Sequence, residues 1–257
     1  MKNEQGTILH VDNVTMRFGG VVAVNGANIR LRRGRLAGII GPNGAGKTTM
    51  FNLISGVYTP VEGEIRFKDQ AITGKSPDEI THLGISRTFQ NIRLFEGLNV
   101  YDNVKMAASC RSEYSFLEAI LGLPKVWKLE REVASEVEYY LDLVGLSGYE
   151  KVWPENLAYG LQRKLEIARA LASKPELLLL DEPAAGLNPT EVQELMEIIR
   201  HIHKELDITI LLIEHHMDMV MSICEELWVM NFGAVIANGD PESVQQDPEV
   251  LKAYLGS

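Results

Sequence analysis

The chain has 257 residues, of which 46% are apolar and 23% are charged, a balance typical of soluble globular proteins. Its formal net charge of −10 disfavours nucleic-acid binding, because phosphate backbones are held mainly by Lys and Arg. The sequence contains neither the run of roughly 18 apolar residues that a membrane span needs nor the apolar core of a signal peptide at its start. We therefore expect a cytoplasmic protein.

Short strands are predicted for the first hundred residues. Alternating apolar residues in 8–18 and 21–31 indicate two half-buried strands, and the continuous apolar run 34–41 indicates a strand covered on both faces. Helical spacing of apolar residues follows in 47–55, and segment 63–72 resembles an edge strand. A glycine-rich stretch between the third strand and the first helix is the first candidate for function.

The pattern changes from about residue 101. An apolar stripe with helical spacing predicts a helix inserted into the fold, with Val126, Leu129, Val133, Val137, Leu141 and Val144 on one face. Buried strands then return in 175–183 and 207–216, on either side of a helix at 189–206, and a strand pair turns near 231–233 before a last helix at 241–257. Alternating strands and helices predict an α/β fold with a parallel sheet.

The stretch GPNGAGKT matches G-x-x-x-x-G-K-[ST], in which backbone N–H groups and a helix N-terminus surround phosphate. Lys47 is expected to reach the terminal phosphates and the Thr48 hydroxyl to bind Mg²⁺. Since the chain has no Asn-Lys-x-Asp guanine motif, a GTPase is disfavoured. The predicted nucleotide contacts here are Gly41, Pro42, Asn43, Gly44, Ala45, Gly46, Lys47, Thr48 and Thr49.

A second acidic element follows four leucines, 177–180, which predict a buried strand. At the end of that strand, Asp181 can hold Mg²⁺ through water and Glu182 can orient or deprotonate an attacking water molecule. Two solvated acids at a strand end would be unremarkable alone. Beside a phosphate loop, they predict nucleotide hydrolysis.

The stretch LAYGLQRKLEIARAL (157–171) sets a glycine-containing turn before a helix, just ahead of the acidic strand. With the phosphate loop, and in this order, it resembles the signature motif of ATP-binding cassette (ABC) ATPases, usually Leu-Ser-Gly-Gly-Gln. The family pairs two cassettes head to tail, each ATP lying between one phosphate loop and the other subunit's signature turn. The resemblance therefore implies that a second cassette's ATP is contacted by Leu157, Ala158, Tyr159 and Gly160.

This resemblance extends from Phe18 to His215 and implies further roles. Phe18 stands where the family has an aromatic residue that stacks on adenine, and Gln90 matches the glutamine that senses Mg²⁺ and the attacking water. His215 matches the histidine that contacts the γ-phosphate. The implied fold is a P-loop NTPase (RecA-like) core with an N-terminal antiparallel β part, spanning 1–100 and 159–257, and an inserted α-helical subdomain, spanning 101–158.

The chain departs from the family pattern at several positions. Ala158 replaces the signature serine and removes a hydroxyl donor to phosphate, a hydrogen bond worth about 1.5–3 kcal/mol. Tyr159, Leu161 and Asn188 replace glycine, glutamine and aspartate, and His216 occupies a usually acidic slot, where we interpret it as a solvated side chain. The resemblance still implies a working ATP and Mg²⁺ site.

Several phrases resemble the ATPase subunits of branched-chain amino acid importers, among them SRTFQNIRLF, LAYG, DEPAAGLNP, LLIEHHMDMVM and a C-terminal AYLG. Lipopolysaccharide-export and urea-import ATPases share some of them. The implied partners are an identical or paralogous cassette, membrane permease subunits at the inner face of the cell membrane and, indirectly, a solute-binding protein. Exposed apolar residues of the insertion, such as Phe116 or Trp127, are candidates for permease docking.

Two other functions stay open from the sequence alone. A non-transport ABC ATPase acting on nucleic acid or ribosomes usually carries coiled coils, zinc modules or a second cassette, and this acidic sequence shows none of them. A regulatory nucleotide-binding protein with little hydrolysis would suit Ala158 and Leu161. Against it stand Lys47, Asp181, Glu182 and His215, all of which are intact.

Overall fold

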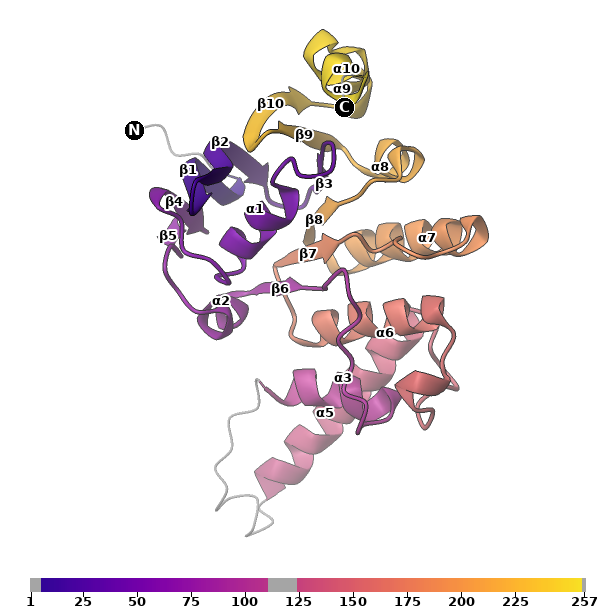
Figure 1. Cartoon of the computed structure of the whole chain (residues 1–257). Helices are drawn as coiled ribbons and strands as arrows, with labels where there is room; N and C mark the ends of the chain where they lie inside the picture. The colour runs from indigo at the N-terminus through magenta and orange to yellow at the C-terminus, as the bar shows by residue number, and fades with distance from the viewer. Residues whose placement is uncertain (1–5, 111–123, 256–257) are drawn as a thin grey trace.

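The computed structural model describes residues 6–110 and 124–255, in which two sheets organise the chain (Figure 1). The four-stranded antiparallel sheet has the order β2-β1-β4-β5 and contains β1 (Thr7–Phe18), β2 (Val21–Arg32), β4 (Glu62–Phe67) and β5 (Gln70–Ala71). The six-stranded sheet has the order β10-β9-β3-β8-β7-β6 and contains β3 (Leu36–Ile40), β6 (Ile85–Arg87), β7 (Leu177–Asp181), β8 (Thr209–Ile213), β9 (Glu226–Asn231) and β10 (Ala234–Gly239).

The six-stranded sheet is parallel from β9 to β6, and β10 pairs with β9 antiparallel. This arrangement confirms the predicted α/β fold and the strand pair that turns near 231–233. The helices of the α/β part are α1 (Lys47–Ile54), α2 (Pro77–Leu83), α7 (Pro189–Leu206), α8 (Met217–Ile223), α9 (Pro241–Gln246) and α10 (Pro248–Leu255). None of the helices in the described ranges is long and apolar enough to cross a membrane.

A helical lobe lies at the bottom of Figure 1, below β6 and β7. Its helices, which pack on one another, are α3 (Val100–Ser109), α5 (Pro124–Leu143) and α6 (Tyr159–Ala172), with a 3₁₀ turn, η1 (Pro154–Asn156), before α6. The predicted stripe of α5 is buried at Val133, Val137 and Leu141, whereas Val126 and Leu129 near its start are half-buried. The division of the chain at 101 and 158 stays a prediction.

Two hydrophobic cores meet across the six-stranded sheet. The first core joins one face of this sheet to α1 and the antiparallel sheet, and the second core joins the other face to the helices α3 and α5 to α10. Alternate side chains of β7 enter different cores: Leu177 and Leu179 lie in the first, and Leu178 and Leu180 in the second. The strand that ends at Asp181 is therefore packed on both faces, as its unbroken run of leucines predicted.

The structure corrects three local predictions. Segment 63–72 forms two strands, and β4 lies between β1 and β5, so only β5 is an edge. The last helix is divided into α9 and α10 because Pro248 lacks the N–H that a continuous helix would use. Helix α6 begins at Tyr159, so the glycine-containing turn that was expected before the helix already belongs to its first turn.

Candidate functional site

The phosphate loop joins β3 to α1 and depends on glycine at two of its positions. Gly41 and Gly46 have φ of 148° and 101°, a region that favours glycine. A Cβ at Gly41 would lie 2.1 Å from the carbonyl oxygen of Met230, and one at Gly46 would lie 2.3 Å from that of Ala23. The backbone path around the predicted phosphate position is thus closed to any other residue.

A cavity of about 380 Å³ lies against this loop. Most of the predicted phosphate-loop contacts line it, and Glu182 and His215 border it from the ends of β7 and β8. The loop residues that line it are Asn43, Gly44, Ala45, Gly46, Lys47, Thr48 and Thr49. The structure therefore brings the predicted loop and two of the predicted hydrolytic residues to one cavity.

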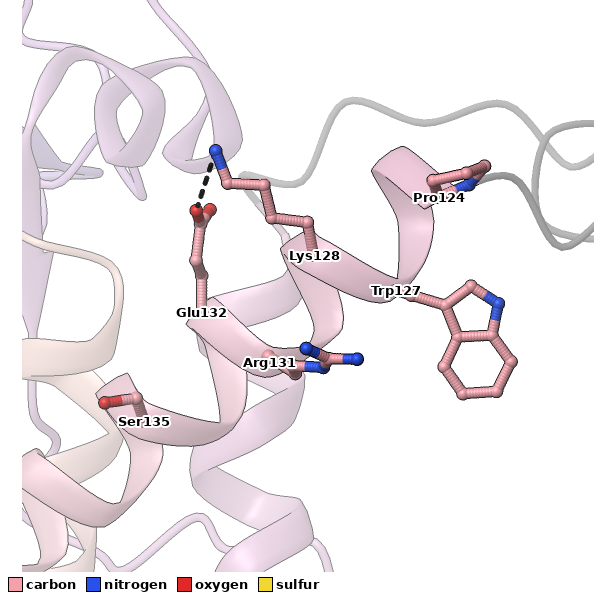
Figure 2. Close-up of a pocket in the computed structure, with 6 residues that line it drawn as sticks. All are labelled: Pro124, Trp127, Lys128, Arg131, Glu132 and Ser135. Atoms are coloured by element: carbon pink, nitrogen blue, oxygen red, sulfur yellow. Dashed lines mark ion pairs between the residues drawn. The ribbon is translucent and has the colours of Figure 1, made fainter.

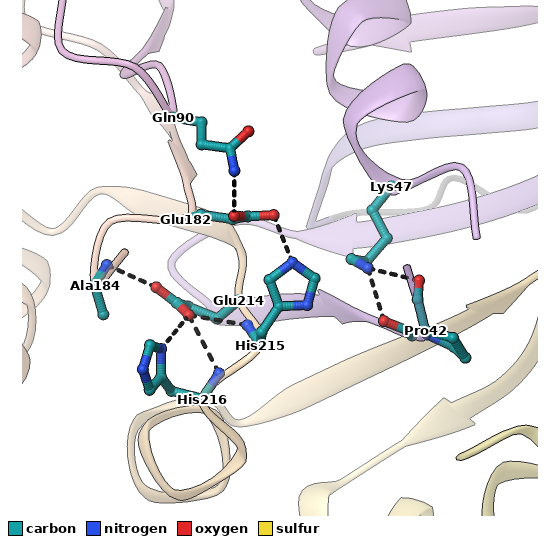
Figure 3. A network of polar contacts seen from close by, with 9 residues as sticks. Pro42, Lys47, Gln90, Glu182, Ala184, Glu214, His215 and His216 are labelled. Carbon is teal, nitrogen blue, oxygen red and sulfur yellow. Dashed lines mark hydrogen bonds and ion pairs between the residues drawn. The ribbon is translucent and has the colours of Figure 1, made fainter. Parts of the chain in front are cut away.

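Lys47 is bound by its own loop. Its ammonium donates hydrogen bonds to the carbonyl oxygens of Gly41 at 2.7 Å and Pro42 at 3.0 Å, and its side chain is buried (Figure 3). Burial lowers the pKa of Lys47, and the nearby charge of Glu182 opposes that shift. Gly41 and Pro42 thus act here as acceptors for the lysine and do not line the cavity themselves.

Glu182 is held from two sides, as Figure 3 shows. Its Oε2 accepts a hydrogen bond of 2.7 Å from Nε2 of Gln90, and its Oε1 lies 2.6 Å from Nε2 of His215. The backbone of Glu182 has φ of 46°, a left-handed conformation that costs a residue with a Cβ roughly 1–2 kcal/mol. Its N–H donates to the carbonyl oxygen of Ile213 at 2.9 Å, which ties this strained residue to β8.

Asp181 is buried beside Arg87, which donates a hydrogen bond of 2.6 Å to Oδ2. Burial raises the pKa of the Asp181 carboxyl, while the hydrogen bond and charge of Arg87 oppose the rise. Arg87 also donates to Oδ1 of Asn52 on α1 and to the hydroxyl of Ser55, the C-cap residue of α1. The acidic strand is thereby joined to the helix that follows the phosphate loop.

The polar groups here fit Mg²⁺. Oδ1 of Asp181 is a buried oxygen without a hydrogen-bond partner among the described residues, and Thr48 lines the cavity at the start of α1. No group of three or more His, Cys, Asp or Glu side chains in the described ranges can hold a metal. Such sparse oxygen donors suit Mg²⁺, which is commonly bound by one or two carboxylates together with substrate phosphates.

Glu214 is a buried residue that the sequence reasoning missed. Its carboxylate accepts hydrogen bonds from the backbone N–H groups of Ala184 at 2.7 Å, His215 at 2.9 Å and His216 at 3.3 Å (Figure 3). The ring of His216, expected to be solvated, is half exposed and lies 3.1 Å from Glu214 through Nδ1. A charged residue at the end of an apolar strand was the available signal, since burial would require several donors around it.

The signature turn lies apart from the phosphate loop within one chain. Ala158, Gly160 and Leu161 border a separate small pocket of about 50 Å³ with Leu187 and Glu191, and no phosphate-loop residue lines it. Leu157 is buried, whereas 43% of Tyr159 is exposed. The family-based expectation that these residues serve a second cassette's ATP stays a prediction.

The start of α6 is fastened to the segment that contains Gln90. Arg163, which is buried, donates to the carbonyl oxygens of Phe89 and Gln90, to Glu166 and to the hydroxyl of Tyr159. No side chain caps the N-terminus of α6, where Ala158 is the N-cap residue. Its first N–H groups therefore present the positive end of the helix dipole at the turn.

Phe18 is another predicted nucleotide contact that does not line this cavity. Its ring packs edge-on against Tyr58, with centroids 5.1 Å apart, and 42% of the residue is exposed. The cavity wall on that side consists of Val21, Val22 and Ala23 instead. Stacking of adenine on Phe18 stays a prediction.

A shallow hollow of about 540 Å³ lies far from these residues, along α5 (Figure 2). Trp127, 63% exposed, points away from the helix there, beside Lys128, Arg131 and Glu132. Phe116, the other predicted docking residue, lies outside the described residues. The hollow shares no residue with the cavity at the phosphate loop.

Known proteins resemble this chain along nearly its whole length. A family model described as ABC transporter matches residues 24–185, and one described as Branched-chain amino acid ATP-binding cassette transporter matches residues 234–257. The high-affinity branched-chain amino acid transport ATP-binding protein BraF of Pseudomonas aeruginosa is 43% identical, over 97% of this chain and 98% of its own. LivG of Escherichia coli K12, which has the same description, is 42% identical over the same shares.

Solved structures agree with these matches. The ADP conformation of MJ1267, an ATP-binding cassette of an ABC transporter, is 32% identical, with a TM-score of 0.84 over 98% of this chain and 99% of that protein. CbiO1 of Clostridium perfringens, described as part of an ABC transporter complex, is 31% identical, with a TM-score of 0.82 over 96% and 94%. The chain therefore belongs to the ATP-binding proteins of ABC transporters, in the branched-chain amino acid group.

Proposed function

We propose that this chain hydrolyses ATP with Mg²⁺ and thereby drives the import of branched-chain amino acids. The observation that carries the proposal is the placement of Glu182, whose carboxylate is held by Gln90 and His215 at the wall of the cavity beside the phosphate loop. A carboxylate held at both oxygens has a fixed direction, as a base that must meet one water molecule requires.

The residues divide the hydrolytic work between them. Glu182 accepts a proton from water as the water oxygen attacks the γ-phosphorus and the bond to the β–γ bridging oxygen breaks, leaving ADP and phosphate. Lys47 exchanges its loop carbonyl acceptors for phosphate oxygens, and His215 donates to the γ-phosphate as negative charge develops. Mg²⁺, which Thr48, Gln90 and Asp181 would hold, supplies neutralisation of phosphate charge.

We infer that hydrolysis requires a second cassette. The uncapped N-terminus of α6 and the glycine at 160 form an anion-binding turn, yet this turn and the phosphate loop line different cavities of one chain. An ATP bound to one subunit's loop would therefore meet Ala158 to Gly160 of another, identical or paralogous, cassette. Because ATP hydrolysis would then depend on the pairing of two cassettes, hydrolysis could be coupled to transport.

The descriptions of the relatives support the proposed cargo and partners. BraF and LivG are described as branched-chain amino acid transport proteins, and CbiO1 as part of a transporter complex. We propose that the chain is peripheral at the inner face of the cell membrane, where it is bound to permease subunits. A solute-binding protein would deliver the amino acid to these subunits. Trp127 is the described residue that we propose for permease contact. The net charge of −10 supports a role without nucleic acid.

Phosphate release from MgATP tests the hydrolytic proposal. Glu182→Gln keeps the shape of the side chain but removes the base, so kcat should fall at least 10²-fold while MgATP affinity stays within a few-fold. Glu197→Gln, at an exposed position of α7, is the matched control and should hydrolyse ATP like wild type. Unchanged phosphate release by Glu182→Gln would contradict the assigned role.

Uptake by a reconstituted complex tests the cargo. Proteoliposomes that contain the permease and this chain should accumulate labelled leucine when ATP and the binding protein are present, and Glu182→Gln should abolish the uptake. Urea uptake, or lipopolysaccharide extraction from the membrane without leucine uptake, would assign the chain to one of the other two ABC systems.

A further inference from the structure

Phe232 occupies a turn that suits other residues better. It forms, with Gly233, the two-residue loop between β9 and β10, and both residues have positive φ, 43° and 83°. Such a turn favours Asn, Asp or Gly at its first position, because an ordinary side chain is strained there. Phe232 is 87% exposed, so burial does not compensate for the strain. Residues that break local rules without packing gain are often functional.

The turn is fastened to the phosphate loop. The N–H of Gly233 donates to the carbonyl oxygen of Ala45 at 3.0 Å, and the N–H of Asn25 donates to the carbonyl oxygen of Gly233 at 2.9 Å. A Cβ at Gly233 would approach the carbonyl oxygen of Ala23 to 3.0 Å. The backbone that carries the phenyl ring is therefore held at a fixed position beside the nucleotide cavity.

Phe232 lines that cavity together with Val21 and Val22. Two-thirds of Val21 and 43% of Val22 are exposed, so three apolar side chains lie open next to a loop of backbone N–H groups and a lysine. An apolar rim beside a phosphate-binding loop is complementary to a ligand with a planar, weakly polar end and a charged end. A nucleoside triphosphate has this chemistry.

We propose that Phe232 is an aromatic contact for the base of the nucleotide. This inference rests on the nucleotide site proposed above and adds a residue outside its motifs. Phe18 packs on Tyr58 and does not line the cavity, whereas Phe232 does. The face of a phenyl ring at this rim can cover the face of the base. Any base can make this contact, so Phe232 contributes to nucleotide affinity and does not select among bases.

Binding of two ligands to purified variants tests the contact. Phe232→Asn installs a residue that the turn favours, so its thermal midpoint should equal or exceed that of wild type. Its affinity for MgATP should fall about tenfold, the effect expected from the loss of one base–aromatic contact. Its affinity for magnesium tripolyphosphate, which has no base, should stay within twofold of wild type.

Two further variants separate the alternatives. Phe232→Tyr keeps the ring and should bind MgATP like wild type, and Trp153→Gln, which removes an exposed ring just before η1, should also leave both affinities unchanged. Unchanged MgATP affinity in Phe232→Asn would overturn the contact. An equal loss for both ligands would also overturn it, by showing that Phe232 shapes the phosphate loop. A wild-type chain that binds neither ligand would instead refute the nucleotide site itself.

Discussion

The Glu214 carboxylate holds the backbone of Ala184, His215 and His216, and therefore the geometry on both sides of Glu182. Replacing it by Gln leaves one oxygen and sets an NH₂ group against N–H donors. The lost charge-assisted hydrogen bonds should destabilise the fold by about 1.5–3 kcal/mol. Displacement of His215 should lower kcat for ATP roughly 10- to 100-fold, as measured by phosphate release.

A surface glutamate gives the control for Glu214. Glu225 forms an exposed ion pair with Arg35, and Glu225→Gln should change stability by less than about 1 kcal/mol and leave kcat unchanged. Equal effects of the two substitutions would show that Glu214 has no special relation to the site. MgATP affinity is expected to survive in both variants, because neither residue lines the cavity.

Arg87 balances the charge of Asp181 inside the protein. Arg87→Met leaves that carboxylate without its buried partner and should cost about 3–5 kcal/mol of stability. A carboxyl with a raised folded-state pKa stabilises the fold below its unfolded pKa, and this contribution is lost as pH rises through the folded pKa. Removing Arg87 raises the pKa of Asp181 further, so the stability deficit should grow from about pH 4 towards neutrality.

Urea unfolding of the single and double variants at several pH values measures this coupling. Arg87→Met combined with Asp181→Asn removes both charges, so its stability deficit should be smaller at neutral pH and nearly independent of pH. A deficit in Arg87→Met that shrinks with rising pH would contradict the assigned balance.

Motif residues were predictable from the sequence, and their supports were not. Lys47, Asp181, Glu182, Gln90 and His215 belong to short patterns that resemble a known family, and the structure groups Lys47, Gln90, Glu182 and His215 near one cavity. Glu214 and Arg87 act through partners that are 30 and 94 residues away. Such pairings become visible only when the strands are in register, so a local pattern can mark a buried charge, as at the end of β8, but does not identify its distant partner.

At the scale of elements, Asn188 begins α7. Its side chain accepts hydrogen bonds of 3.0 Å from the N–H groups of Thr190 and Glu191, and Glu191 reciprocates to the N–H of Asn188. Asn188→Ala should cost about 1 kcal/mol, or roughly 2–4 °C in Tm. Asn188→Asp restores the family residue and keeps the acceptor, so stability should stay within about 1 kcal/mol in thermal unfolding.

Comparison of the two Asn188 variants separates capping from other roles. A loss of stability in Asn188→Asp as large as in Asn188→Ala would mean that the side-chain oxygen is not what stabilises α7. Because Asn188 does not line the cavity beside the phosphate loop, both variants should bind MgATP as wild type does.

Elements with strong periodicity were predicted well, and weak or interrupted ones were not. The helix at 189–206 and the buried strands at 177–181 and 209–213 match their apolar patterns. The turn between β4 and β5 was missed because its Lys68 and Asp69 both have positive φ, a conformation that no glycine signals there. Val22 follows the strand alternation yet is 43% exposed, because it faces the cavity rather than a core.

At the scale of the whole molecule, light scattering of Glu182→Gln tests pairing. This variant should retain ATP, so ATP with Mg²⁺ should convert a monomer into a particle of twice the mass. Adding Ala158→Ser restores a hydroxyl donor at the signature turn. The dimer should then persist at protein concentrations about tenfold lower than without this substitution.

Either outcome identifies the partner. Dimers of Glu182→Gln would show that the altered signature turn works on an identical subunit. A monomer that binds ATP would indicate either a paralogous cassette as the partner, in which case mixing the two chains should produce the dimer, or a signature turn too weak to close the site alone, in which case Ala158→Ser should restore the dimer. Lys47→Ala, which should lose phosphate binding, is the control that must remain monomeric in both cases.

The alternation of leucines along β7 between the two cores also governs how the protein acquires its site. A slip of β7 by one residue would exchange the sides of all four leucines. The positions of the Asp181 and Glu182 carboxylates are therefore fixed only once both cores have formed. A folding intermediate with the first core alone would have a phosphate loop without correctly aligned acids. ATP hydrolysis should therefore develop later in refolding than nucleotide binding, because binding needs the phosphate loop and hydrolysis also needs the aligned acids.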